Sequence, residues 1–309
     1  MPTVLPAVLP AGLPAVLPAV LPTVLPVVLT VGSLHYDIMV EADHLPRRDE
    51  TAVGRRWYPK FGGKGANQAA AAAKAGAESR MVGAVGDDDF GRYLRENLIA
   101  AQVDDRYVAT VAGIGSGMSV AIQDGSGDYA ATIVSGANLH IAAQALANDA
   151  IWQGAGVLVL QNEVPEAINS TAAAEARKRG IPTLLNAAPY RALSADFRRL
   201  VDILVVNAVE AEMMGAARVC CLHGAADAAK KLADQFETVI VTAGSAGLAA
   251  WGAHGEVVLL PAEKVQVVSS HGAGDAFIGT LAAQIAAGQG LEAACRAAST
   301  AAARHVAGL

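Results

Sequence analysis

From Val27 onward, short apolar runs rich in β-branched residues alternate with segments that carry a helical pattern. One helical segment covers 166–179 and stops at Gly180, and another covers 225–234. Buried strands that alternate with amphipathic helices are typical of βαβ units, in which a mostly parallel sheet is covered on both faces. The sequence therefore predicts an α/β fold. The runs expected to be strands are 27–31, 157–160, 183–185, 203–206, 239–241, 257–259 and 265–268.

The first 26 residues have a different character, because proline recurs every fourth residue from Pro2 to Pro26. Each proline inside a helix costs roughly 3 kcal/mol, so a membrane-spanning helix is not expected here. The segment also has no basic n-region of the kind that begins a secretory signal. We interpret residues 1–26 as a disordered low-complexity extension and residues 27–309 as one domain.

The charge and the cysteine content limit the kinds of partner and bound metal that are expected. The formal net charge is -6 and the lysines and arginines are scattered, so a nucleic-acid surface is not expected. The three cysteines, Cys220, Cys221 and Cys295, have neither metal-ligand nor disulfide spacing. Free thiols of this kind fit a reducing cytoplasm.

Two segments interrupt the alternation of strands and helices. Residues 37–58 are charged and extended, and residues 119–134 have the pattern of two strands around a turn at 124–127. Together they predict a small β-sheet that projects from the main sheet as a lid. We expect the lid segments to cover about 37–60 and 115–135.

Polar and glycine residues follow the predicted strands. In open α/β sheets, ligands bind outside the carboxyl ends of the strands, so these residues mark the expected site. They are Asp37, Glu163, Asn186, Asn207, Glu210, Thr242, Gly244 and the segment 272–275.

The motif GAGDAF at 272–277 is the sharpest chemical signal. Phe277, Leu281 and Ile285 follow at helical spacing, and Gly288 is the expected stop. The small residues before this helix are expected to present unpaired backbone N–H groups to an anion, strengthened by the helix dipole. These residues are Gly272, Ala273 and Gly274.

Asp275 looks misplaced in an anion site, because a carboxylate repels phosphate. It fits if the carboxylate accepts a proton from an attacking hydroxyl while the amides stabilise the transferred phosphoryl group. The alternative is an ordinary aspartate in a first helical turn, where it favours the dipole. A dinucleotide fingerprint requires Gly or Ala at Phe277, and the glycines at 62–65 lack the spacing and hydroxyl of a P-loop.

Two weaker patterns accompany this motif. FGGKGANQ at 61–68 leads into an Ala-rich helix that ends at Gly76, and its Lys64 and Asn67 offer donors to hydroxyls or phosphate. Asn207 and Glu210 lie one helical turn apart, where they suit either a hydrated Mg²⁺ or a helix N-cap with Glu at N3.

GGKGANQ and GAGDAF, in this order and roughly 200 residues apart, resemble the ribokinase branch of the phosphofructokinase-B family of carbohydrate kinases. The resemblance runs from about residue 27 to the C-terminus. It implies a Rossmann-like αβα sandwich with a small β-sheet lid that closes over the sugar and often forms a dimer surface. It also implies an ATP- and Mg²⁺-dependent kinase, with ribose as the expected acceptor and Asp275 as the base that deprotonates a primary hydroxyl.

The resemblance also implies roles for other positions of this sequence. Gly272, Ala273 and Gly274 match the anion hole. Sugar-binding positions are matched by His35, Asp37, Gly63, Lys64, Gly65, Asn67 and Glu163. ATP-binding positions are matched by Asn207, Thr242, Gly244, Ser245, Gly247, Gly274 and Ser299, and Asn207 with Glu210 match positions near Mg²⁺, with water between.

The sequence departs from the family pattern at several positions. His35 replaces the usual asparagine, so the identity of the sugar is open between ribose, another sugar and a nucleoside. Ser269 replaces an aspartate that helps to bind a monovalent cation, so little K⁺ stimulation is expected. Relatives continue beyond Leu309 through the rest of the cation loop, and His271 occupies a variable position.

Two other functions remain as alternatives. One is a non-catalytic sugar- or nucleotide-binding homologue, and the other is a nicotinamide-dependent oxidoreductase. Asp275 argues against the first, and the incomplete fingerprint at 32–35 argues against the second.

Overall fold

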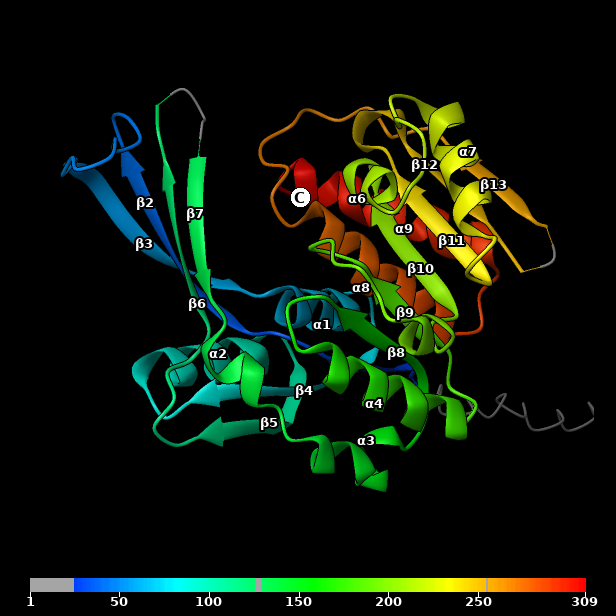
Figure 1. The fold of residues 1–309 in the computed structure, drawn as a ribbon, viewed down its shortest axis with the longest axis horizontal. Coiled ribbons are helices and arrows are strands. Elements are labelled where there is room, and N and C mark those ends of the chain that lie inside the picture. Colours follow the sequence, from blue (N-terminus) through cyan, green and yellow to red (C-terminus); the bar gives the residue numbers. More distant parts are fainter. Residues whose placement is uncertain (1–24, 126–128, 254) are drawn as a thin grey trace, which may run out of the picture.

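The computed structural model describes residues 25–125, 129–253 and 255–309, and Figure 1 shows their arrangement. The proline-repeat prediction falls almost entirely on residues outside this range, as does part of the predicted turn at 124–127. Within the described residues, no helix is both long and apolar enough to cross a membrane.

A nine-stranded sheet forms the centre of the described chain, in the order β13-β12-β11-β10-β9-β8-β1-β4-β5. The strands from β5 to β11 are parallel, and β12 and β13 add an antiparallel edge. The α/β prediction is confirmed. The strands are β1 (Val27–Val31), β4 (Glu78–Gly86), β5 (Val103–Val111), β8 (Ala155–Gln161), β9 (Thr183–Asn186), β10 (Ile203–Asn207), β11 (Thr238–Thr242), β12 (Leu248–Trp251) and β13 (Val257–Leu260).

Helices cover both faces of this sheet (Figure 1). One face packs against α1 (Lys64–Lys74), α2 (Asp89–Ala100), α8 (Ala273–Ala286) and α9 (Leu291–Val306). The core on the opposite face includes α4 (Glu166–Lys178) and α7 (Leu222–Leu232), together with the shorter α3 (Asp149–Trp152), α5 (Ala195–Arg198) and α6 (Ala208–Met213). Short 3₁₀ turns are η1 (Gly136–His140), η2 (Ala143–Ala147) and η3 (Gly244–Ala246).

A second sheet of four strands projects from one side of the molecule, at the upper left of Figure 1. Its order is β3-β2-β6-β7, with β2 (His35–Ala42), β3 (Gly54–Gly62), β6 (Met118–Gln123) and β7 (Tyr129–Val134). At its base, Tyr36 stacks on Phe90 of α2 with ring centroids 4.0 Å apart. This sheet is the predicted lid, and its strands lie close to the predicted bounds.

The prediction of a strand at 265–268 is wrong. This segment has no regular structure, and the side chains of Val267 and Val268 are 66% and 72% exposed. Its backbone is tied instead to the end of α9, since the N–H groups of Val268 and Ser269 both donate to the carbonyl of Val306. The antiparallel strand β13 precedes it and stands at the edge of the main sheet, and the segment does not pair with it. The chain therefore reaches α8 through a loop.

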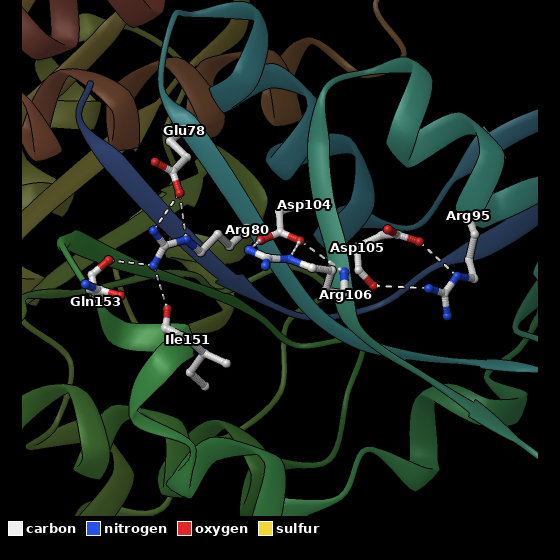
Figure 2. A network of polar contacts seen from close by, with 8 residues as sticks. All are labelled: Glu78, Arg80, Arg95, Asp104, Asp105, Arg106, Ile151 and Gln153. Carbon is white, nitrogen blue, oxygen red and sulfur yellow. Dashed lines mark hydrogen bonds and ion pairs between the residues drawn. The ribbon is translucent and has the colours of Figure 1, made fainter. Parts of the chain in front are cut away.

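Polar contacts gather at the amino ends of β4 and β5, and those of Arg80 on β4 reach Ile151 and Gln153 at the end of α3 (Figure 2). The buried guanidinium of Arg80 donates to Glu78 Oε1 at 2.5 Å and to the carbonyl of Gln153 at 2.5 Å. On β5, Arg106 pairs with Asp104. Because the network lies at the amino ends of these strands, opposite the expected ligand edge, we assign it a structural role.

Candidate active site

The carboxyl ends of four neighbouring strands bring polar side chains together. Gln161 at the end of β8 is in register with Asn186 at the end of β9, and Asn207 of β10 is in register with Thr242 of β11. The register places Asn186, Asn207 and Thr242, three of the residues predicted at strand ends, at one edge of the sheet, whereas Asp37 lies on the lid strand β2. Helix α8 begins at this same edge.

The start of α8 is set by Gly272, which has a φ of 86° and acts as the N-cap. A residue with a side chain rarely adopts this left-handed conformation. The N–H of Ala273 donates to Ser270 O at 3.3 Å, so the prediction of an unpaired amide at Ala273 is wrong for this structure. Among the described residues, the amides of Gly272 and Gly274 have no backbone partner and are free to bind an anion.

Asp275 lies in the first turn of α8 and is held by two amide side chains of α1. Gln68 Nε2 donates to its Oδ1 at 3.0 Å, and Asn67 Nδ2 donates to its Oδ2 at 3.3 Å. Burial raises the pKa of Asp275 above its ordinary value, while Lys64 and the two amides oppose this shift. The result is an ionisable carboxylate in a poorly solvated position, which suits a general base.

Gln68 is a site residue that the sequence analysis missed. Its Nε2 group donates to Asp275 and also, at 3.0 Å, to Asn186 Oδ1 at the end of β9. The side chain is 1% exposed. Its adjacency to Asn67 in the GGKGANQ motif is the only sequence signal that pointed to it.

Two further carboxylates lie near the start of α1 and on the lid. Glu163 Oε2 accepts from Ser33 Oγ at 2.6 Å and from the backbone N–H of Lys64 at 2.8 Å, and His35 Nδ1 is 3.8 Å away. Asp37 lies on β2, where its Oδ1 accepts from Ser119 Oγ at 2.5 Å. Burial raises the pKa of Asp37.

Gly63 and Gly65 have a structural reason to be glycine. A Cβ at Gly63 would lie 2.7 Å from His35 N, and one at Gly65 would lie 2.6 Å from Ser33 N. Gly63 also has a φ of 88°. These glycines therefore allow the start of α1 to pack on the chain between β1 and β2, which brings Lys64 and Asn67 to the sheet edge.

The predicted nucleotide residues follow β10 and β11. Asn207 and Glu210 form a capping box: Asn207 Oδ1 accepts from Glu210 N, and Glu210 Oε2 accepts from Asn207 N, both at 2.9 Å. Burial raises the pKa of Glu210, and the charge of Lys64 opposes this shift. Lys64 thus acts electrostatically on both Glu210 and Asp275, which links the two halves of the site. The turn after Thr242 contains Gly244 and Gly247, with φ angles of 54° and 107°, and places Ser245 between them.

A family model described as pfkB family carbohydrate kinase matches residues 26–307. The chain belongs to this family. Ribokinase of Mus musculus is 34% identical over 260 residues, covering 83% of this chain and 80% of the relative. Deoxyribokinase of Salmonella typhi is 32% identical over 255 residues, covering 82% and 83%. The structure of Arabidopsis thaliana ribokinase complexed with ribose and ATP superimposes with a TM-score of 0.84 at 29% identity, covering 91% and 93%. The ribokinase-like fold is confirmed.

In this pfkB chain the loop before α8 is supported by the end of α9. His305 Nε2 lies 2.9 Å from the carbonyl oxygen of His271 and therefore donates to it, and a Cβ on Gly272 would lie 2.9 Å from the same nitrogen. Ser269 Oγ accepts from His271 N at 3.3 Å, so this hydroxyl stabilises the loop locally. Ser299 lies half-buried on α9, and Thr300 beside it bonds Glu263.

Proposed function

We propose that this chain is an ATP-dependent kinase that phosphorylates the primary hydroxyl of a small sugar, with ribose as the principal acceptor. The observation that carries the proposal is Asp275, held by Gln68 and Asn67 beside the free amides at the start of α8. We assign residues 27–309 to one kinase domain and place the protein in the cytoplasm.

Asp275 is the proposed general base. The amides of Gln68 and Asn67 each donate to a different oxygen of the carboxylate, which fixes its plane and stabilises its ionised form. The acceptor hydroxyl gives its proton to this carboxylate as the oxygen attacks phosphorus. The amides at Gly272 and Gly274, together with the ammonium of Lys64, stabilise the negative charge on the transferred phosphoryl group.

The residues after β10 and β11 fit a magnesium nucleotide. ATP supplies the transferable phosphoryl group. Within the described range, no cluster of three or more His, Cys, Asp or Glu side chains is arranged to hold a metal directly. Magnesium that keeps its waters and binds mainly to phosphates fits this arrangement, with Glu210 and Asn207 reaching it through water. The proposed ATP-binding residues are Asn207, Thr242, Gly244, Ser245, Gly247, Gly274 and Ser299.

The sugar is proposed to lie between the lid and the start of α1. Asp37 approaches from the lid and Glu163 from the sheet edge, so the two carboxylates can accept hydrogen bonds from different hydroxyls. Ribokinases of known sequence and structure are among the relatives of this chain. The other proposed sugar-binding residues are His35, Gly63, Lys64, Gly65 and Asn67.

Two further features complete the proposal. Ser269 supplies no carboxylate to a monovalent cation, so K⁺ is expected to stimulate the reaction little. The face of the lid that carries Trp57 combines this exposed side chain with partly exposed apolar side chains of β2 and β6, and we propose that two copies of the chain pair through it.

The test is ADP release with ribose, 2-deoxyribose, fructose and nucleosides as acceptors, in wild type and in Asp275→Asn. Loss of the base is expected to lower kcat by about 10²- to 10⁴-fold and to leave ATP affinity unchanged within about threefold. Asp89→Asn is the matched control, since Asp89 is an exposed carboxylate in the first turn of α2. Equal turnover by wild type and Asp275→Asn, or turnover of none of these acceptors by wild type, contradicts the proposal.

A further inference from the structure

Lys60 lies on the lid directly opposite Asp37. The two residues are register partners on the antiparallel strands β3 and β2, and Ser119 is the partner of Asp37 on β6. Direct partners on one face of a sheet have their Cβ atoms about 4.5–5.5 Å apart. Lys60, Asp37 and Ser119 therefore form one row across the lid, on the face that carries Asp37.

This row lies just before the start of α1, the helix whose Asn67 and Gln68 hold Asp275. The charges of Asp37 and Asp275 both act on Lys60, and each raises its pKa, while its partial burial lowers the pKa by a larger amount. The charge of Lys60 also acts on His271, in the loop just before the free amides. Lys60 is thus a lid residue within electrostatic range of both the proposed sugar carboxylate and the proposed base.

The ammonium of Lys60 has no ion-pair or hydrogen-bond partner among the described residues. In the outer part of the same strand ladder, by contrast, the arginine side chains are paired. There Arg56 of β3 bonds its register partner Glu41 at 2.5 Å, and Arg55 pairs with Asp43. At the inner end, Asp37 bonds Ser119 instead of Lys60.

The position of the Asp37 carboxylate depends on the space left by Gly62. A Cβ on Gly62 would collide with Asp37 Oδ2, so the absence of a side chain there lets Asp37 lean along β3, toward Gly62. Asp37 Oδ1 is occupied by Ser119, whereas Oδ2 accepts no hydrogen bond from the described residues. The lid therefore presents one unused acceptor and one half-buried, unused cationic donor beside each other.

We propose that Lys60 and Asp37 together bind, and thereby recognise, two adjacent hydroxyls of the acceptor sugar. The 3-hydroxyl donates to Asp37 Oδ2, and the neighbouring 2-hydroxyl accepts from the ammonium of Lys60. Both contacts are made by a sugar with adjacent secondary hydroxyls, such as ribose, and one is lost with 2-deoxyribose. A half-buried donor left unpaired is costly, so the site rejects the sugar that cannot satisfy it. The inference deepens the proposed function and rests on it.

The test compares kcat/KM for ribose and for 2-deoxyribose in wild type, Lys60→Met and Lys60→Arg. Hydrogen bonds to charged groups predict a wild-type preference for ribose of about 10- to 100-fold. In Lys60→Met the preference is expected to fall below about threefold through a higher KM for ribose, with the KM for ATP unchanged. Lys60→Arg is expected to restore part of the preference. Lys74→Met, which removes an exposed lysine at the far end of α1, is the matched control and is expected to behave as wild type.

The outcomes separate the inference from the proposed function. Wild type that phosphorylates ribose and 2-deoxyribose equally overturns the inference and leaves the kinase intact. So does a ribose preference that survives in a folded Lys60→Met variant, as judged by its thermal midpoint. Ribonate serves as an acidic acceptor. If wild type prefers ribonate to ribose and Lys60→Met does not, Lys60 binds a carboxylate, and the proposed binding of two adjacent hydroxyls is wrong. Wild type that phosphorylates no sugar rejects the proposed function, and the inference falls with it.

Discussion

Asp275 and Gln68 form the contact on which the chemistry depends at the scale of single residues. The hydrogen bond from Gln68 lowers the pKa of Asp275, whereas burial raises it. A general base must be ionised, so kcat/KM falls on acidification as Asp275 takes up a proton. Because its pKa is raised, this loss is expected at a higher pH than for an ordinary aspartate.

In Gln68→Met one bond to the ionised form is lost, so the pKa of Asp275 rises further and the acid limb of kcat/KM moves to higher pH. The pH profile of ribose phosphorylation measures this shift, and Gln284→Met near the other end of α8 is the control. An acid limb at the same pH in Gln68→Met and wild type would show that Gln68 does not act on the base.

Single residues also show which parts of the candidate site could be predicted from the sequence. Asp275 and Lys64 could be predicted, because a carboxylate among glycines at a helix start, and a lysine in a glycine loop, are unusual combinations. Gln68 could not, because its partners Asn186 and Asp275 lie 118 and 207 residues away. Its position in an Ala-rich helix does not reveal which face is covered.

At the scale of elements, the site depends on how closely α1 and α8 cross. A Cβ on Gly279 of α8 would lie 2.6 Å from Ala72 N and would also collide with Gln68 O and Ala71 Cβ. Gly279 therefore lets α8 approach the backbone of α1 next to Gln68. This spacing sets the distance from Gln68 to Asp275.

Gly279→Ala is expected to destabilise the fold by about 1–3 kcal/mol through overpacking. It is also expected to lower kcat, since it pushes Gln68 away from Asp275. Urea unfolding and ribose turnover measure the two effects. Gly290→Ala is the control, because its Cβ meets open space and its φ is -66°, so it should change stability by no more than about 0.5 kcal/mol. A Gly279→Ala protein as stable and active as wild type would contradict the tight crossing.

Elements that the sequence mispredicted have a common cause. The run at 265–268 has strand propensity but pairs with no strand, because its backbone bonds the end of α9, and β-propensity depends on strand neighbours. Strand β4 was not among the predicted runs because it includes the buried Arg80 and two glycines. Its place in the sheet comes from pairing with β1 and β5, which the local pattern does not contain.

For the whole molecule, the parallel sheet and the projecting lid could be predicted from patterning, because strand–helix alternation and its interruption are both local. The proposed pairing of two copies through the lid, by contrast, depends on a surface that only the folded chain presents. On the face opposite Asp37, alternation places Ile38 and Val40 of β2, Trp57 of β3, and Val120 and Ile122 of β6. Trp57 is 61% exposed, and this apolar face has the character of an interface.

Trp57→Glu places a charge at the centre of this face, where pairing would bury it without a partner, so the proposed dimer is expected to become a monomer. Light scattering at micromolar protein gives the mass directly. Ile99→Glu is the matched control, since Ile99 is 60% exposed but lies on α2, outside the lid, and this variant should remain dimeric. A monomeric wild type, or a Trp57→Glu variant that keeps the dimer mass, excludes pairing through the lid. If the lid must be held by a second copy to cover the sugar, the Trp57→Glu monomer should also show a higher KM for ribose with an unchanged KM for ATP.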